Sequence, residues 1–309
     1  MAKIFIDGSA GTTGLRIRER LASRRDLEIA TLPDELRKDP AARAGAIDSA
    51  DVAFLCLPDA AAVEAVSLVP GTSATIIDTS TAHRTAPGWT YGMPELPGMR
   101  RRIRESRRIA NPGCHASGFI LLVAPLVEAG IVPRSSALCA FSLTGYTGGG
   151  KKMIAEYEDA AGRPPLLDSP RQYGLTQFHK HLPEMVKYSG LDLAPAFCPV
   201  VADFPSGMEV TVPLFARDIS GTAGDIAAAY RAAYPAGGVV TFAGDESEGG
   251  FLAASALAGS DAMRITIHGN AERIILAARY DNLGKGASGA AIQNMNIALG
   301  LPECEGLLL

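Results

Sequence analysis

The turn that ends at Cys114 is the part of the sequence whose residue types most directly suggest covalent chemistry. Pro112 and Gly113 bring the chain into a turn, and the sequence predicts that a helix begins at or just after Cys114. A thiol at a helix N-terminus has a lowered pKa and is a better nucleophile near neutral pH. Cys114 is therefore a candidate nucleophile, with a small buried residue as the alternative. We expect that second role for Cys56, Cys139 and Cys198.

Two histidines, His179 and His181, lie two positions apart. In an extended segment, both side chains would project to the same face. Imidazole titrates near neutral pH, so either residue could act as a general acid or base. A His-x-His pair also occurs at metal sites, but no third ligand lies nearby in the sequence, and we expect no metal. The other three histidines are expected to be ordinary polar or supporting residues, namely His83, His115 and His268.

A glycine-rich segment near the start of the chain follows a predicted strand over residues 3–7 and precedes a predicted helix over residues 15–23. Its candidate cofactor-binding residues are Gly8, Ser9, Gly11, Thr12, Thr13 and Gly14. Glycines at this spacing allow a tight turn and let a pyrophosphate approach the backbone, and the helix N-terminus favours the anion. The segment therefore indicates a dinucleotide site, with a tight turn that binds no ligand as the alternative.

The end of the second predicted strand, over residues 27–32, bears on which dinucleotide binds. An acidic residue there would bind an adenosine ribose hydroxyl and favour NAD. The strand instead ends on an uncharged stretch, from Thr31 to Pro33. Charged residues of both signs follow, namely Asp34, Glu35, Arg37 and Lys38. The sequence therefore favours NADP.

Polar residues from Asp78 to Arg84 follow another buried strand, predicted over residues 75–78. In a parallel sheet, this places them at the carboxyl edge, where ligands bind. Arg84 could hold a carboxylate or phosphate through two hydrogen bonds. The alternative is a surface arginine that closes a loop.

Composition excludes several classes of protein. The chain has 309 residues, 47% of them hydrophobic, which suggests about two domains with sizeable cores. A net charge of −4 argues against a nucleic-acid binder, so we expect the six arginines within residues 99–108 to form a solvated helix face. Five scattered cysteines without a CxxC pair argue against a zinc cage or a disulfide framework. The N-terminus reads as a strand, and the most apolar run, residues 119–127, is too short to cross a bilayer. We expect a cytoplasmic protein with no membrane partner.

The pattern of elements changes after about residue 112. Before it, strands over residues 3–7, 27–32, 52–57, 75–78 and 108–110 alternate with helices over residues 15–23 and 60–68, which predicts a parallel α/β sheet. After it, an apolar helix over residues 116–129 precedes a region of α+β type. Its predicted strands cover residues 136–143, 197–203, 207–214, 264–269 and 273–280, and its predicted helices cover residues 151–160 and 222–234. A last helix is predicted over residues 286–299.

Taken together, these stretches resemble the N-acetyl-gamma-glutamyl-phosphate reductases of arginine biosynthesis, in their shorter, type 2 form. This family lies within the wider group of aspartate-semialdehyde dehydrogenases. The similar stretches run in the same order through most of the chain: residues 8–14, 77–80 with Arg84, 91–96, 111–114, 179–184, 281–287 and 293–296. The chain departs from the longer form after the cysteine, where His115, Ala116 and Ser117 replace Tyr-Pro-Thr, and in the glycine loop at residues 146–150.

The resemblance implies an NADPH-dependent reduction of N-acetyl-glutamyl 5-phosphate through a thioester on Cys114. It implies an acid–base role for one histidine of the pair; we favour His181, with His179 orienting the substrate, and the spacing leaves the reverse order as the alternative. The implied substrate-binding residues are Ser80, Arg84 and Asn111. Further implied cofactor-binding residues are Leu57 and Pro58, with Asn282, Gly286 and Ala287 at the nicotinamide end.

The resemblance also implies the architecture: an α/β protein with a Rossmann-type parallel sheet domain and an α+β substrate domain with a mixed sheet. The NADP-binding domain would comprise residues 1–112, completed by the C-terminal helix within residues 282–309. Residues 113–281 would form the catalytic, substrate-binding and oligomerisation domain of a homo-oligomer, a dimer or tetramer. The alternatives are an aspartate-semialdehyde dehydrogenase, a lysine-pathway relative with a carrier-bound substrate, and a nucleotide-sensing protein without catalysis.

Overall fold

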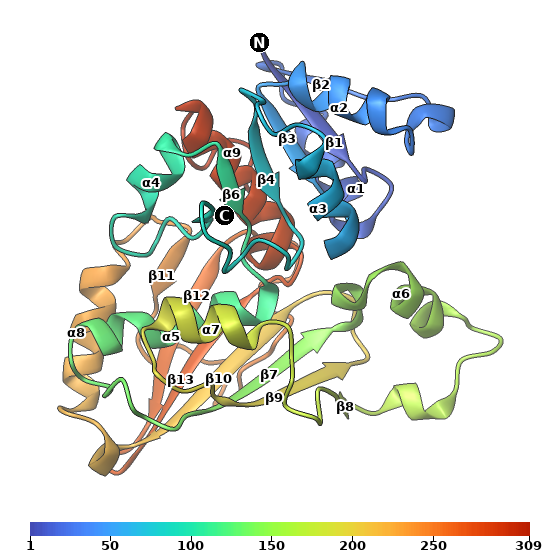
Figure 1. Ribbon diagram of the computed structural model, residues 1–309. Coiled ribbons are helices and arrows are strands. Elements are labelled where there is room, and N and C mark those ends of the chain that lie inside the picture. The colour runs from blue at the N-terminus through green and yellow to red at the C-terminus, as the bar shows by residue number, and fades with distance from the viewer. The chain divides into compact units, whose positions relative to one another are not determined.

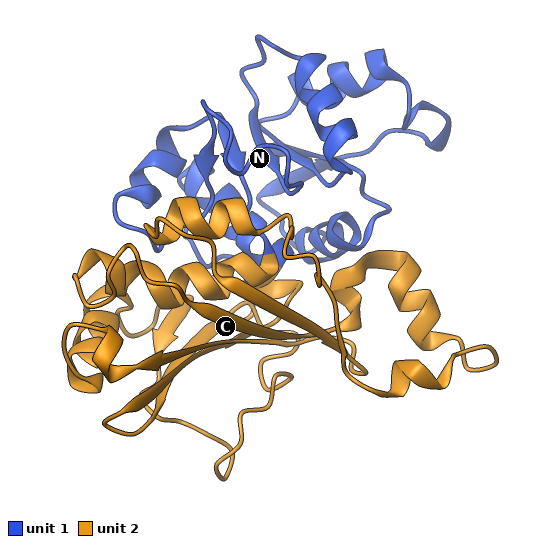
Figure 2. Cartoon of the chain, turned by 60° about the horizontal axis from the view of Figure 1, so that its bottom comes forward, with its two compact units in different colours: residues 1–113, 287–307 blue, residues 114–286, 308–309 orange.

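The chain folds into two compact units, which Figure 2 shows in different colours. The computed structural model describes residues 1–309. Unit 1 comprises Met1–Gly113 and Ala287–Leu307, and unit 2 comprises Cys114–Gly286 with Leu308–Leu309. None of the helices combines the length and hydropathy that a membrane-spanning helix requires.

Unit 1 is built on a six-stranded sheet in the order β2-β1-β3-β4-β6-β5, in which every pairing is parallel. The strands are β1 (Ala2–Asp7), β2 (Leu27–Ala30), β3 (Val52–Leu55), β4 (Thr75–Asp78), β5 (Thr90–Tyr91) and β6 (Arg108–Ala110). All four residues of β3 and of β4 are buried, as expected of parallel strands covered on both faces. The predicted parallel α/β sheet is confirmed.

The helices of unit 1 are α1 (Thr12–Leu21), α2 (Pro40–Asp48), α3 (Asp59–Ser67), α4 (Met99–Glu105) and α9 (Gly289–Leu299). Helix α2 packs against β1 and α3, while α9, from the far end of the chain, packs against α1, α4 and β4 (Figure 1). Helix α4 carries four of the six arginines, and all four are exposed as predicted, whereas Arg107 follows the helix and Arg108 lies partly buried on β6. Helix α2 was not predicted, although Asp39 accepts a hydrogen bond from the Ala42 amide and Pro40 occupies the first turn, both of which are helix-start signals.

Unit 2 is built on a seven-stranded mixed sheet in the order β11-β12-β13-β10-β7-β9-β8. The strands are β7 (Cys139–Gly145), β8 (Arg171–Gln172), β9 (Ala196–Ala202), β10 (Met208–Phe215), β11 (Val240–Phe242), β12 (Met263–Gly269) and β13 (Arg273–Tyr280). The β7–β9 and β11–β12 pairs are parallel, and the other pairs are antiparallel. The expected second domain with a mixed sheet is therefore confirmed.

The helices of unit 2 are α5 (Cys114–Glu128), α6 (Gly150–Glu158), α7 (Leu182–Ser189) and α8 (Ala223–Ala233). Helix α5 packs against β10, β13, α7 and α8 and is apolar on almost all sides because it is covered on almost all sides (Figure 1). Along β7 and β10, alternate residues point away from the core, which leaves Phe141 and Phe215 half exposed. Cys139 lies at one of these outward positions and is exposed, so the expectation that it is buried was wrong.

Several boundaries differ from the sequence prediction for local reasons. Helix α1 begins at Thr12, directly after Gly11, rather than at residue 15. The predicted last helix begins with a wide turn over Gly284–Ser288, and its regular part starts at Gly289. The predicted glycine loop near residue 146 is a short 3-10 turn, Tyr146–Gly149, that leads into α6.

Gly118, near the start of α5, offers a test of how tightly the side chains of unit 2 are packed. A methyl group at Gly118 would lie 2.7 Å from both the Tyr280 Oη and a Val210 methyl carbon. We therefore expect Gly118→Ala to lower the free energy of unfolding by about 1–3 kcal/mol, as overpacked buried sites generally do. Gly45→Ala is the matched control, because Gly45 lies within α2 and a methyl group there would meet nothing within 4 Å. Urea denaturation would measure both variants. Equal stabilities would contradict the tight contact.

Candidate functional site

Cys114 is the first residue of α5 and is partly exposed. The Tyr280 hydroxyl donates a hydrogen bond to its carbonyl oxygen at 2.6 Å and accepts one from the Gly118 amide at 3.1 Å. A methyl group at Gly286 would lie 3.0 Å from the Cys114 Cβ, so the Gly286 backbone packs directly against the cysteine. No acidic residue lies in the first turn of α5, and the positive end of the helix dipole suits an anionic sulfur.

Three histidine rings gather in unit 2, two of them predicted to be functional. The ring centroids of His179 and His181 are 4.8 Å apart, and they lie 5.7 and 5.6 Å from that of His115. The segment that carries them is not extended. The chain turns here, the His181 amide donates to the His179 Nδ1 at 3.2 Å, and His181 then precedes the first turn of α7. The two rings are in contact and nearly perpendicular to each other.

His115 is buried beneath the other two histidines. Its Nδ1 lies 2.6 Å from the Ser142 Oγ, and its Nε2 lies 2.6 Å from the Tyr173 Oη. Burial, assisted by the charges of His179 and Lys180, lowers the pKa of His115 to about 3. His115 is therefore neutral at pH 7, with both nitrogens engaged, and is suited to support rather than to transfer protons.

Tyr173 connects the histidines to the cysteine. Burial raises the pKa of Tyr173 well above its usual range, and the charge of a Cys114 thiolate raises it further. Its hydroxyl therefore stays protonated, at hydrogen-bond distance from the His115 Nε2. Sequence reasoning missed Tyr173, Ser142 and Tyr280, because no local pattern marks a residue whose partner is far along the chain.

In unit 1, the glycine loop is packed backbone against backbone. Gly8 has a φ of +83°, and a methyl group there would lie 2.3 Å from the Cys56 carbonyl oxygen. A methyl group at Gly14 would lie 2.5 Å from the Gly8 carbonyl oxygen. Gly11 precedes α1 with no side-chain cap, and the first turn of α1 has no acidic residue. The amides of that turn, which includes Thr12 and Thr13, fit a pyrophosphate at the positive end of the helix.

The loop lies where the order of the sheet changes direction. Strand β1 has β2 on one side and β3 on the other, and dinucleotides bind at such switch points outside the carboxyl ends of the strands. The segment after β3 is close by, since a Leu57 methyl carbon would lie 3.1 Å from a methyl group at Gly8. Pro58 then starts α3. The structure thus brings Leu57 into the neighbourhood of the glycine loop.

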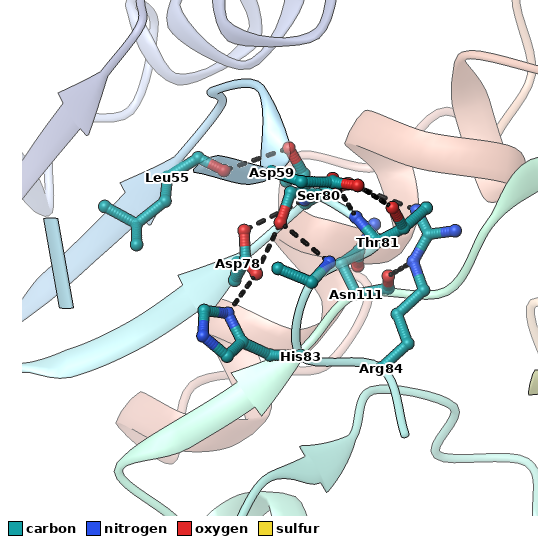
Figure 3. Close-up of polar contacts among 10 residues, drawn as sticks. Leu55, Asp59, Asp78, Ser80, Thr81, His83, Arg84 and Asn111 are labelled. Atoms are coloured by element: carbon teal, nitrogen blue, oxygen red, sulfur yellow. Dashed lines mark hydrogen bonds and ion pairs between the residues drawn. The ribbon is translucent and has the colours of Figure 1, made fainter. Parts of the chain in front are cut away.

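The segment after β4 is held by its own polar side chains (Figure 3). The buried Asp78 carboxylate accepts hydrogen bonds from the Ser80 amide at 2.9 Å and the Ser80 hydroxyl at 2.7 Å. The same carboxylate lies 2.6 Å from the His83 Nδ1, and the His83 ring stacks on Trp89. Ser80 is therefore fixed at the carboxyl edge of β4, with its hydroxyl hydrogen directed to Asp78.

Arg84 joins this segment to the residues before Cys114. Its Nε donates to the Asn111 carbonyl oxygen at 3.0 Å, and its Nη2 donates to the Thr79 carbonyl oxygen at 3.2 Å (Figure 3). The Asn111 side chain donates to the Ala287 carbonyl oxygen at 3.0 Å and accepts from Asn294 at 3.1 Å. Arg84 is thus buried with part of its guanidinium on main-chain carbonyls, a positioning role that the sequence did not predict.

Asn282 is buried in unit 2 and bridges two loops. Its Oδ1 accepts from the Gly207 amide at 2.9 Å, and its Nδ2 donates to the Thr147 Oγ1 at 3.0 Å. The neighbouring Asp281 accepts from the amides of Leu283 and Gly284, at 2.7 and 2.8 Å. These bonds fix the wide turn that carries Gly286 past Cys114. No group of three His, Cys, Asp or Glu side chains in the chain could hold a metal ion.

Comparison with known proteins assigns both units to one family. Residues 3–105 match the family "Semialdehyde dehydrogenase, NAD binding domain", and residues 114–282 match "Semialdehyde dehydrogenase, dimerisation domain". The N-acetyl-gamma-glutamyl-phosphate reductase of Brucella anthropi is 47% identical over 96% of this chain and 98% of its own. That of Brucella ovis is 46% identical over 96% and 99%. This chain belongs to the N-acetyl-gamma-glutamyl-phosphate reductase family.

Members of the reductase family are oxidoreductases, and unit 1 carries the family's nicotinamide-cofactor domain.

Solved structures of other proteins show the same fold at low sequence identity. Aspartate semialdehyde dehydrogenase II of Vibrio cholerae is 15% identical, with a TM-score of 0.73 over 97% of this chain and 99% of its own. The NADP complex of the Candida albicans enzyme is 14% identical, with a TM-score of 0.70 over 97% and 99%. The likeness to these two structures concerns the fold alone.

The burial of the His115 imidazole makes the free energy of unfolding depend on pH. Its pKa of about 3 in the folded chain is below the usual 6.5, so between these values the unfolded chain binds a proton that the folded chain does not. Stability therefore falls as the pH drops from about 6.5 towards 3, by up to about 1.4 kcal/mol per pH unit from this group.

We expect the free energy of unfolding of His115→Gln to depend less steeply on pH than that of the wild type, as measured by urea denaturation between about pH 6.5 and 4.5. His268→Gln controls for the loss of an imidazole. An unchanged slope in His115→Gln would contradict the assignment.

Proposed function

We propose that this chain reduces N-acetyl-gamma-glutamyl phosphate to N-acetylglutamate 5-semialdehyde with NADPH, releasing phosphate. The observation that carries the proposal is Cys114 at the start of α5, followed directly by a neutral His115 against which His179 and His181 pack. The near-complete match to relatives named as this reductase supports the substrate.

The reaction proceeds through a thioester on Cys114. The thiolate attacks the acyl carbon, the bond to the phosphate oxygen breaks, and phosphate leaves. NADPH, when bound, supplies the hydride that reduces the thioester carbon. The oxyanion left by hydride transfer takes a proton from His181 to give a thiohemiacetal, and His181 takes that proton back as the C–S bond breaks, which frees the aldehyde and restores the cysteine. Covalent catalysis of this kind replaces one difficult displacement with two easier steps.

His181 is the proposed acid–base residue. It directly precedes α7, and its neutral imidazole can take the thiol proton. His179 accepts a hydrogen bond at Nδ1 from the His181 amide, so its neutral ring carries its proton on Nε2. That tautomer can donate a hydrogen bond to a substrate oxygen, which suits an orienting role.

We assign the pyrophosphate site of the cofactor to unit 1 and the covalent chemistry to unit 2. The pyrophosphate would bind the amides that follow Gly11, with Leu57 and Pro58 beside them. Asn282, Gly286 and Ala287 would shape the nicotinamide end, and Ser80, Arg84 and Asn111 would contact the substrate. Arg37 and Lys38, on the chain beyond β2, favour the 2′-phosphate of NADP, since no acidic residue ends that strand.

We further infer that the chain forms a homo-oligomer through the open face of the unit 2 sheet. Phe141 on β7, Phe215 on β10 and Ile275 on β13 are exposed there on three neighbouring strands. Exposed apolar side chains that gather on one face mark an interaction surface. The family name of this region, a dimerisation domain, supports a second copy as the partner.

The reverse reaction tests the substrate and the cofactor together. With phosphate and NADP, we expect rapid reduction of NADP with N-acetylglutamate semialdehyde and at least about tenfold slower reduction with aspartate semialdehyde or with NAD, a difference of about 1.4 kcal/mol. Absorbance of the reduced nicotinamide would follow the rate. Cys114→Ala should abolish turnover while NADPH binding survives. Faster turnover of aspartate semialdehyde would show that the chain acts on that substrate instead. No turnover of either semialdehyde would point to a carrier-bound substrate or to a binding protein without catalysis.

Separate replacement of the two histidines by asparagine tests their roles. We expect His181→Asn to lower kcat by about 10²–10⁴-fold, the usual contribution of a general acid or base. His179→Asn should mainly raise the KM for the acyl phosphate, because it removes a hydrogen bond to the substrate. Steady-state kinetics over pH 6–9 would separate the two effects. A larger loss of kcat in His179→Asn would reverse the assignment.

A further inference from the structure

The turn that precedes His179 contains an unusual backbone conformation. Gln177 has a φ of +58° and is the one non-glycine residue of the chain with a positive φ. This left-handed region disfavours residues with a Cβ, and glycine or asparagine is more usual there. Strain of this kind persists where surrounding contacts enforce it, often at functional sites.

Two hydrogen bonds from the Gln177 side chain enforce this conformation. The Oε1 accepts from the Phe197 amide at 2.8 Å, and the Nε2 donates to the Phe197 carbonyl oxygen at 2.8 Å. The turn itself is closed by a bond from the Gln177 amide to the Gly174 carbonyl oxygen at 3.0 Å.

The side-chain amide of Gln177 takes the place of a missing strand. Strand β8 pairs with β9 only at Val200 and Val201, and the Tyr173 amide then donates to the Pro199 carbonyl oxygen at 3.0 Å. Beyond that point the chain leaves the edge of β9 at Gly174, where φ is +65°. A primary amide carries the same donor and acceptor as a peptide group. Gln177 therefore completes the edge of β9 at Phe197, which the departing backbone would otherwise leave unpaired.

Phe197 links this edge to the histidines. Its buried ring lies 5.0 Å from the His179 ring and 5.4 Å from the His115 ring, both edge to face. One residue thus holds the turn through its backbone and the histidine that follows the turn through its side chain. The turn also separates neighbouring side chains, because Phe178 is 93% exposed while His179 lies against the cluster.

We propose that Gln177 is a positioning residue that, by pairing with the Phe197 backbone, fixes the turn that holds the His179 imidazole in the site. The proposal deepens the proposed function and rests on it for the expected loss of rate. Its structural part, the placement of His179, stands apart from any activity.

Two variants separate the hydrogen bonds from the strain. Gln177→Gly removes both side-chain bonds and also removes the cost of the positive φ, so the turn can persist without its attachment. Gln177→Glu keeps an acceptor for the Phe197 amide but sets a carboxylate oxygen against the Phe197 carbonyl oxygen. Gln172→Glu is the matched control, since it makes the same change of charge at an exposed position on the neighbouring β8.

We expect both Gln177 variants to lose kcat by about tenfold or more, corresponding to about 1.4 kcal/mol, and to keep their affinity for NADPH. Their thermal midpoints should stay close to that of Gln172→Glu, which should have wild-type kinetics. A merely structural role would lower the midpoint and leave the pH profile of kcat unchanged, whereas displacement of His179 should shift that profile.

Histidine NMR provides a readout that does not depend on activity. The chain has five histidines, so ¹³C-labelled histidine gives five ring signals, assigned by single replacements. The His179 signal should move in both Gln177 variants, while those of His83 and His268 should not. An unmoved His179 signal, or a moved signal with wild-type kcat, would overturn the proposal. If the wild type reduces neither semialdehyde, the proposed function fails, and the His179 signal alone decides whether Gln177 positions that ring.

Discussion

The first turn of α5 is the constraint on which the candidate site depends. An α-helix normally joins a carbonyl to the amide four residues later. Here the Tyr280 hydroxyl bridges that pair, from the Cys114 carbonyl to the Gly118 amide, at 2.6 and 3.1 Å. Glycine at 118 leaves space for the hydroxyl, and glycine at 286 lets the backbone approach Cys114. The place of the cysteine is therefore set by residues that do not react.

The three histidines of unit 2 differ in their hydrogen bonds and therefore in their proposed roles. His115 is neutral and bonded on both nitrogens, so it serves as a rigid floor under His179 and His181. Phe197, on β9, contacts the rings of His115 and His179, and Gln177, in the turn before His179, bonds to the Phe197 backbone through its side-chain amide. Phe197 thus contacts two of the three rings, His115 and His179, from the same strand.

Unit 1 is organised by a different constraint, the close approach of main chains. Gly8 and Gly14 are required because a side chain at either would collide with a carbonyl oxygen. The buried Asp78 carboxylate then holds Ser80 and His83 at the neighbouring strand end, and Arg84 holds Asn111. Contacts between main chains determine the conformation of the loop after β1. Hydrogen bonds between polar side chains determine the conformation of the segment after β4.

The sequence by itself determined the features that depend on neighbours along the chain. Short apolar runs predicted the strands of unit 1, and the turn before Cys114 predicted a helix that begins at the thiol, because strand and helix patterns are local. Only the tertiary structure decided the rest. The bridge from Tyr280, the neutral state of His115 and the pairing of Gln177 with Phe197 each join residues that lie at least 20 positions apart in the sequence. The turn at the two histidines is closed by bonds to His179 itself, from the His181 amide to its Nδ1 and from the Leu182 amide to its carbonyl oxygen, which the two-residue spacing does not show.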